Sequence, residues 1–156
     1  MIRTCQNIPT GVAIFLYAVL LLSSRPPATA SESPVAEIRA VLDAQMEAWN
    51  RGDIDGYMDG YAREEETQFV SGDTVTRGWQ TVRDRYAKKY DTAEKMGKLS
   101  FTEVEIALLG EEAALVVGRW KLERAEDQPQ GRFTLVFRRN RDGWRIVHDH
   151  TSSATS

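Results

Sequence analysis

The sequence predicts an α+β fold, with a cone-shaped, curved antiparallel sheet packed on three helices. Apolar residues recur at helical spacing through the first half of the chain after residue 33, whereas four long segments of alternating polarity occupy the second half. Long strands twist and coil, so such a sheet curves around the helices and leaves a hollow at its open end. A length of 156 residues is that of a single domain.

The first two helices are predicted over 34–51 and 54–61. Ser33 can cap the first helix, and Gly52 ends it because glycine readily takes a positive φ. The buried face of this helix is expected to carry Ile38, Leu42, Gln45 and Trp49. Asp53 can cap the second helix, whose apolar face is expected to carry Ile54, Tyr57, Met58 and Tyr61.

A short hairpin and a third helix follow. Strands are expected at 67–70 and 75–77, because Gly72-Asp73 between them is a turn sequence. The third helix, over 79–90, is expected to bury Trp79, Val82, Tyr86 and Tyr90. Its basic residues are expected mostly to face water: Arg83, Arg85, Lys88 and Lys89. Residues 91–98 are expected to form a loop.

Four strands complete the chain, at 99–109, 113–124, 132–139 and 144–151. In the first of them, alternation places together Thr102, Val104, Ile106 and Leu108. In the third, Phe133, Leu135 and Phe137 share a face. Asp142-Gly143 predicts a tight hairpin turn before the last strand.

Residues 1–30 are predicted to be a signal peptide. Arg3 supplies positive charge, 12–22 is an unbroken apolar run of 11 residues, and Ala28-Thr29-Ala30 has the small-x-small pattern of a cleavage site. The alternative is a membrane anchor, but a spanning helix needs about 20 apolar residues. We therefore expect an exported protein, periplasmic or secreted, with a mature domain over 31–156 and no stable membrane anchor after cleavage.

Composition excludes several classes of protein. Cys5, the only cysteine, lies in the predicted signal, so the mature domain has no disulfide and no cysteine-bound metal. The chain has 20 basic and 23 acidic side chains, and loss of Arg3 and Arg25 leaves 18 against 23, a net charge of −5. Mild acidity with mixed signs argues against nucleic acid or an anionic membrane as a partner.

Four segments carry a resemblance to a known family. They are AWNRGDID at 48–55, Gly78-Trp79, EEAALV at 111–116 and DGWRIVHDHTS at 142–152. In this order they resemble the nuclear transport factor 2-like superfamily, also called SnoaL-like, over residues 35–152. The last run resembles the uncharacterised bacterial branch of that superfamily. It is also similar to the association domain of calcium/calmodulin-dependent protein kinase.

The resemblance implies a cystatin-like roll, frequent homodimerisation through the sheet, and a pocket that differs between members. Some members are isomerases or cyclases that use a carboxylate or a histidine as a proton shuttle, whereas others bind ligands or only assemble. By similarity to the kinase module, the pocket-lining positions are Trp120, Leu135 and Thr151. That module has arginines there and this chain has none, so an anion pocket of the kinase type is not expected.

The candidate catalytic residues are Asp149, His148 and His150, all on the last strand. The two histidines share one face and Asp149 takes the other. If Val147, Asp149 and Thr151 face the hollow, Asp149 is a buried carboxylate whose pKa is raised, as a general base near neutral pH requires. Alternatively, Asp149 only fixes the strand through hydrogen bonds. The His-x-His pair could bind a metal, but no third ligand is visible, so neither a metal nor a cofactor is expected.

Aromatic residues form the second candidate site. The expected ligand-binding residues are Trp49, Tyr57, Tyr61, Phe69, Tyr86, Tyr90, Trp120, Leu135 and Thr151. The alternative is that these side chains are simply core. Three functions follow: an exported domain that binds a small apolar or aromatic molecule, an isomerase, cyclase or dehydratase using Asp149 or His148, or a module for dimerisation and assembly.

Overall fold

The computed structural model describes residues 32–154, so the predicted signal peptide lies outside the described residues. The helices are α1 (Pro34–Asn50), α2 (Ile54–Met58), α3 (Trp79–Lys89) and α4 (Ala93–Met96). The strands are β1 (Gln68–Ser71), β2 (Thr74–Arg77), β3 (Lys98–Leu108), β4 (Ala113–Glu123), β5 (Gln130–Asn140) and β6 (Gly143–Thr151). Within this part of the chain, no helix has the length and hydrophobicity needed to cross a membrane.

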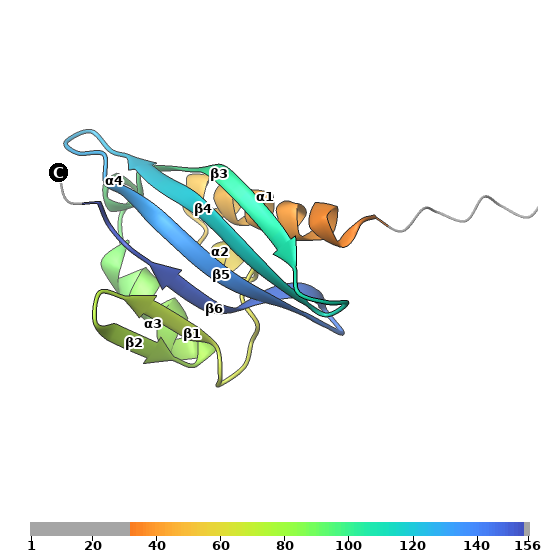
Figure 1. Ribbon diagram of the computed structural model, residues 1–156. Helices are drawn as coiled ribbons and strands as arrows, with labels where there is room; N and C mark the ends of the chain where they lie inside the picture. Colours follow the sequence, from red (N-terminus) through yellow and green to blue (C-terminus); the bar gives the residue numbers. More distant parts are fainter. Residues whose placement is uncertain (1–31, 155–156) are drawn as a thin grey trace, which may run out of the picture. The chain divides into compact units, whose positions relative to one another are not determined.

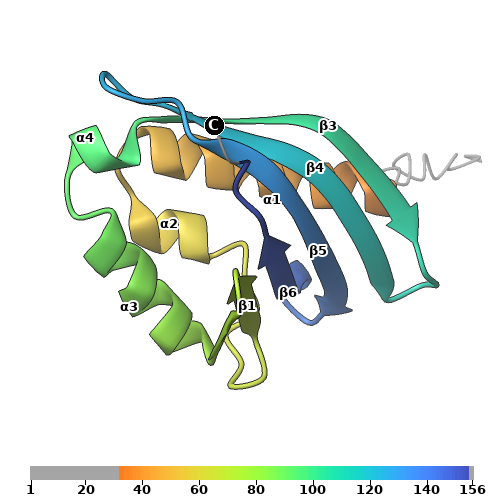
Figure 2. The ribbon, with the colours of Figure 1, turned by 60° about the vertical axis from the view of Figure 1, so that its left-hand side comes forward.

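The predicted α+β fold with a curved sheet is confirmed. The six strands form one sheet in the order β2-β1-β6-β5-β4-β3 (Figure 1). The sheet curves, and the helices lie along its concave side (Figure 2). One pairing departs from the fully antiparallel expectation, because β1 runs parallel to β6. The long connection from β1 to β6, which includes α3, α4 and four strands, allows this parallel pairing, which a tight turn cannot make.

The amino-terminal helices begin at the capping residues that their sequences predict. The Ser33 hydroxyl accepts a hydrogen bond from the Ala36 amide at 3.2 Å, and Asp53 accepts one from the Gly56 amide at 2.7 Å. The predicted face of α1 is buried, with Ile38, Leu42, Gln45 and Trp49 all inside. The second helix is shorter than predicted and ends at Met58. Tyr61 therefore follows the helix and forms a β-bridge with Ile146.

A bulge overturns the predicted alternation of β3. Thr102 pairs with Arg119 and Glu105 with Val117, so two residues of β3 lie opposite one residue of β4. Glu103 has a φ of 50°, as one residue of a bulge often requires. Side chains change face at this point. The strand therefore turns Leu99 and Phe101 inward before the bulge, and Val104 and Ile106 after it, while Thr102 and Leu108 are exposed.

A second bulge corrects the predicted face of β6. His148 pairs with Val136 and Ile146 with Phe137, which leaves Val147 as an extra residue without a partner across the sheet. The residues that share the concave face are therefore Ile146 and Asp149, both buried, rather than Val147 and Asp149. Asp149 itself lies on this face and is buried.

The segment predicted as a loop over 91–98 contains the short helix α4. Thr92 caps it by accepting a hydrogen bond from the Lys95 amide at 3.3 Å. Met96 at its end is buried, and the Met96 carbonyl accepts a hydrogen bond from the Trp49 indole at 3.1 Å. This helix closes one end of the space between α1 and the sheet.

Candidate functional site

A cavity of about 100 Å³ lies between the helices and the concave face of the sheet. All nine residues predicted to bind a ligand line it: Trp49, Tyr57, Tyr61, Phe69, Tyr86, Tyr90, Trp120, Leu135 and Thr151. They come from α1, α2, α3, four strands and, for Tyr61 and Tyr90, the residues that follow α2 and α3, so the sheet's curvature is what brings them together. The space is large enough to hold several water molecules, and it opens to solvent on one side.

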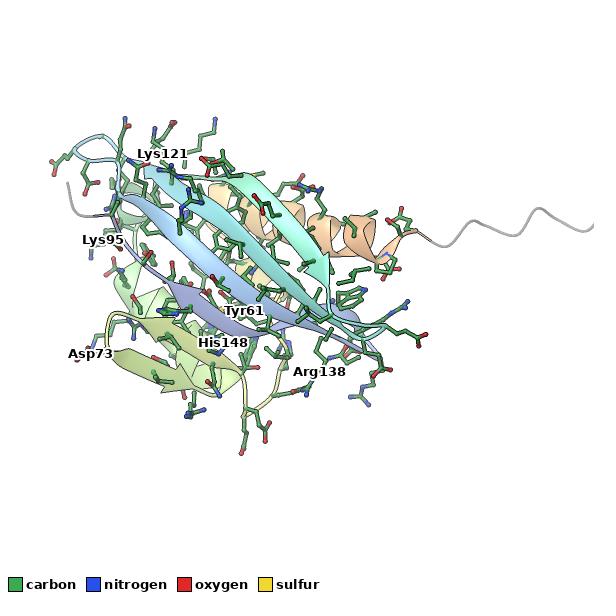
Figure 3. All side chains as sticks on the ribbon, in the orientation of Figure 1. Tyr61, Asp73, Lys95, Lys121, Arg138 and His148 are labelled. Atoms are coloured by element: carbon green, nitrogen blue, oxygen red, sulfur yellow. The ribbon has the colours of Figure 1, made fainter. Side chains whose placement is uncertain are left out.

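The three candidate catalytic residues separate onto two faces of β6. Asp149 is 5% exposed and lines the cavity, whereas His148 and His150 belong to the opposite face and do not line it. Figure 3, in which the helices lie behind the sheet, labels His148 on this strand. Among the described residues, no three His, Cys, Asp or Glu side chains come together as metal ligands.

Among the described residues, Asp149 is the only acidic side chain that lines the cavity. Its Oδ2 accepts a hydrogen bond of 2.7 Å from the Tyr61 hydroxyl. Its Oδ1 is buried and has no hydrogen-bond partner within residues 32–154. Burial disfavours the charged form and raises the pKa of Asp149 to about 7, although the hydrogen bond from Tyr61 acts in the opposite direction. Asp149 therefore exchanges a proton readily at neutral pH.

Three buried tyrosine hydroxyls accompany Asp149 in the cavity. Burial is the largest cause that raises the pKa values of Tyr57, Tyr61 and Tyr86 above the usual value, and the negative charge of Asp149 adds to it. All three side chains therefore remain protonated, and the single hydroxyl proton of Tyr61 is donated to Asp149. The Tyr57 ring lies 5.1 Å from Trp49 and 5.2 Å from Tyr86 between ring centroids, which holds these donors in a packed aromatic wall.

Replacing Tyr61 by phenylalanine is expected to raise the pKa of Asp149 further above 7. The hydroxyl of Tyr61 stabilises the charged carboxylate, and its removal takes that stabilisation away. The carboxyl carbon of Asp149, followed by NMR during a pH titration, reports this pKa directly. A Tyr90→Phe variant is the control, because Tyr90 lines the cavity but has no part in the pKa shift of Asp149. An unchanged or lower pKa in Tyr61→Phe would contradict the assignment.

The structure adds polar residues that the sequence did not assign to the site, among them Gln45, Arg85 and Lys89. Gln45 was placed on the buried face of α1, and it also lines the cavity, where its amide donates to the Tyr57 carbonyl at 2.9 Å. Arg85 and Lys89 were predicted mostly to face water, but both line the cavity at its solvent side. Their positions directly before Tyr86 and Tyr90 were the available signal, since adjacent helical residues flank the same buried face.

The family of this chain follows from comparison with known proteins. A model of the SnoaL-like domain matches residues 38–156. The chain belongs to the SnoaL-like domain family. This confirms the resemblance that the sequence segments indicated. No curated protein matches this SnoaL-like chain.

Solved structures place this SnoaL-like domain in the nuclear transport factor 2-like fold. A nuclear transport factor 2-like protein of unknown function from Shewanella oneidensis MR-1 is 43% identical, with a TM-score of 0.74, over 77% of this chain and 99% of that chain. A ketosteroid isomerase-like protein from Erwinia carotovora atroseptica is 18% identical, with a TM-score of 0.65, over 81% of this chain and 100% of that chain. A proposed calcium/calmodulin-dependent protein kinase II association domain from Xanthomonas campestris is 18% identical, with a TM-score of 0.64, over 83% and 94%.

Proposed function

We propose that the domain binds a small, largely apolar carbonyl compound in its cavity and that Asp149 moves a proton on that compound. The reaction class is that of an isomerase or a dehydratase. The observation that carries the proposal is the buried Asp149 carboxylate, with one oxygen held by Tyr61 and the other without a partner among residues 32–154, in an aromatic cavity. A pKa of about 7 suits a general base and acid at neutral pH.

In this reaction, Asp149 takes a proton from the carbon next to the carbonyl group. The electron pair of the broken C–H bond moves toward the carbonyl oxygen, and negative charge develops there. A tyrosine hydroxyl donates a hydrogen bond to that oxygen; Tyr57 and Tyr86 both keep their protons and line the same cavity. Neutral Asp149 then returns the proton to another carbon, or to a leaving hydroxyl group. One fold relative is named as ketosteroid isomerase-like, which agrees with this chemistry.

Binding without chemistry is the second candidate function. The aromatic wall around Trp49, Tyr57 and Tyr86 favours it, because flat apolar molecules pack well against such rings. In this function Asp149 only anchors Tyr61 to β6. Both functions require the same cavity, but only the first requires proton transfer by Asp149. An experiment that measures binding and proton transfer together therefore separates them.

Hydrogen exchange into a small ketone tests the two functions together. The wild-type protein in D₂O is expected to bind 2-indanone and to accelerate deuterium exchange at the carbons next to its carbonyl group, measured by NMR. Asp149→Asn should reduce the accelerated rate at least about a hundredfold while the fold is retained, because it removes the general base. His148→Gln is the control and should leave the rate unchanged, because His148 does not line the cavity.

The outcomes of that experiment are distinct. Bound 2-indanone with equal exchange rates in the wild type and in Asp149→Asn would remove catalysis and leave a binding domain. A loss of exchange in His148→Gln as large as in Asp149→Asn would contradict the role given to Asp149. No binding of the ketone would contradict both functions.

Export and homodimerisation belong to the same proposal. Export rests on the apolar run at 12–22 and the Ala28-Thr29-Ala30 pattern after it. A homodimer rests on the family resemblance. The proposal therefore describes an exported homodimer that binds its ligand outside the cytoplasm.

A further inference from the structure

The solvent side of the cavity carries two cations from one face of α3. Arg85 and Lys89 are four residues apart, so they lie one turn from each other on the helix surface. Tyr86 and Tyr90, the next residue after each, line the cavity wall. The helix therefore presents aromatic rings and positive charges to the same opening.

Arg85 has no carboxylate partner among the described residues, in contrast to its neighbour on the helix. Arg83 contacts Asp55 at 2.7 Å and Asp84 at 3.1 Å. Arg85 donates one hydrogen bond, of 3.0 Å, to the Thr76 hydroxyl, and its guanidinium lies 5.1 Å from the centre of the Phe69 ring. These contacts fix the guanidinium group at the cavity. They also leave most of its five N–H donors available for a ligand.

Lys89 adds a second positive charge at the same opening. Its ammonium lies 5.2 Å from the centre of the Tyr90 ring, and no carboxylate within residues 32–154 contacts it. Asp149 does not offset these charges at close range. The pKa of Asp149 responds to burial and to Tyr61, with no contribution from Arg85 or Lys89. The two cations therefore act on a different part of the ligand from the part that meets Asp149.

We propose that the ligand carries a carboxylate, which Arg85 and Lys89 bind at the opening while its apolar part fills the aromatic cavity. The planar fork of Arg85 matches the geometry of a carboxylate, and Lys89 adds charge without a fixed direction. A positive opening on an acidic domain also concentrates anions at that place. This inference rests on the proposed function and names its ligand class as small apolar carbonyl compounds that also carry a carboxylate. It differs from an anion pocket of the kinase type, whose arginines would stand at Trp120, Leu135 and Thr151.

A matched pair of probes tests this inference by calorimetry on the full-length protein. Indane-2-carboxylate and indane-2-carboxamide have nearly the same shape and differ in charge. The wild type is expected to bind the carboxylate about tenfold more tightly at low salt, which corresponds to the affinity of a charge-assisted hydrogen bond. The preference should shrink in about 0.5 M salt, because exposed charges are screened.

One variant removes the two proposed charges, and a second variant is its control. The double variant Arg85→Gln and Lys89→Gln should lose the preference for the carboxylate and keep its affinity for the carboxamide, which also shows that it is folded. Lys88→Gln removes the same charge from an exposed residue of α3 that does not line the cavity, and it should keep the preference.

Each remaining outcome overturns a defined statement. Equal affinities of the wild type for the two probes would overturn the carboxylate inference, and bound 2-indanone would then leave the proposed function in place. A loss of preference in Lys88→Gln as large as in the double variant would overturn the assignment to Arg85 and Lys89. If none of the three indane compounds binds, the proposed function and this inference both fail.

Discussion

Raising the pH from 5 to 8 is expected to lower the free energy of unfolding by about 3 kcal/mol through Asp149 alone. The folded-state pKa of about 7 lies above the ordinary aspartate pKa of 3.8. Between these two values the folded protein holds a proton on Asp149 that the unfolded chain has released. Stability from this group is therefore complete below pH 4, falls as the pH rises, and levels off above the folded-state pKa. The lowered pKa values of Asp53 and Asp55 do not affect this range, because both groups are ionised in the folded and unfolded states.

Asp149→Asn should remove this dependence, because an asparagine amide does not titrate. In urea unfolding at pH 5, 6, 7 and 8, the free energy of unfolding is expected to change less with pH in the variant than in the wild type. Asp73→Asn, at the exposed turn between β1 and β2 (Figure 3), is the control and should retain the slope of the wild type. A slope in Asp149→Asn equal to that of the wild type would show that Asp149 is not a buried carboxyl with a raised pKa.

Trp49→Ala is expected to lower the free energy of unfolding by about 4 kcal/mol, the usual cost of removing a buried tryptophan. Trp49 is 3% exposed and packs edge-on against Tyr57, Tyr86 and Tyr90, with ring centroids 4.7 to 6.2 Å apart. Its indole also donates to the Met96 carbonyl, which joins α1 to α4. The substitution thus leaves an empty space where the indole was. It also leaves the carbonyl of Met96 without its hydrogen-bond donor.

Two further variants separate these contributions in denaturant unfolding. Trp49→Phe keeps an aromatic ring and loses the indole donor. The free energy of unfolding should therefore fall by a smaller amount, roughly 1–2 kcal/mol. Trp120→Ala makes the same truncation at a half-buried tryptophan of the cavity and should also cost less than Trp49→Ala. A loss of less than about 1 kcal/mol in Trp49→Ala would show that this ring is not part of the core.

Local periodicity predicted the parts of the fold that depend on one element at a time. The buried face of α1, the cap at Ser33 and the inward face of β5 with Phe133, Leu135 and Phe137 all occur as expected. These features follow from the spacing of apolar residues and from short-range hydrogen bonds, both of which a single segment contains.

The two bulges could not be predicted in the same way. Alternation in β3 breaks at Glu103, and alternation in β6 breaks at Val147. A bulge exists only relative to the hydrogen bonds of the neighbouring strand, and one extra residue moves every later side chain to the other face. This is why Thr102 was grouped on one face with Val104 and Ile106, and Val147 rather than Ile146 was grouped with Asp149.

The sequence by itself determined the fold class, the family and the supply of aromatic residues, because patterns of polarity and composition are carried along the chain. Only the tertiary structure decided that Tyr61 meets Asp149, 88 residues away, and leaves its other oxygen without a partner among the described residues. It also decided that Arg85 and Lys89 stand at the opening of the cavity. The physical reason is that burial, and with it the pKa of Asp149, depends on surfaces that distant segments bring together around one carboxylate.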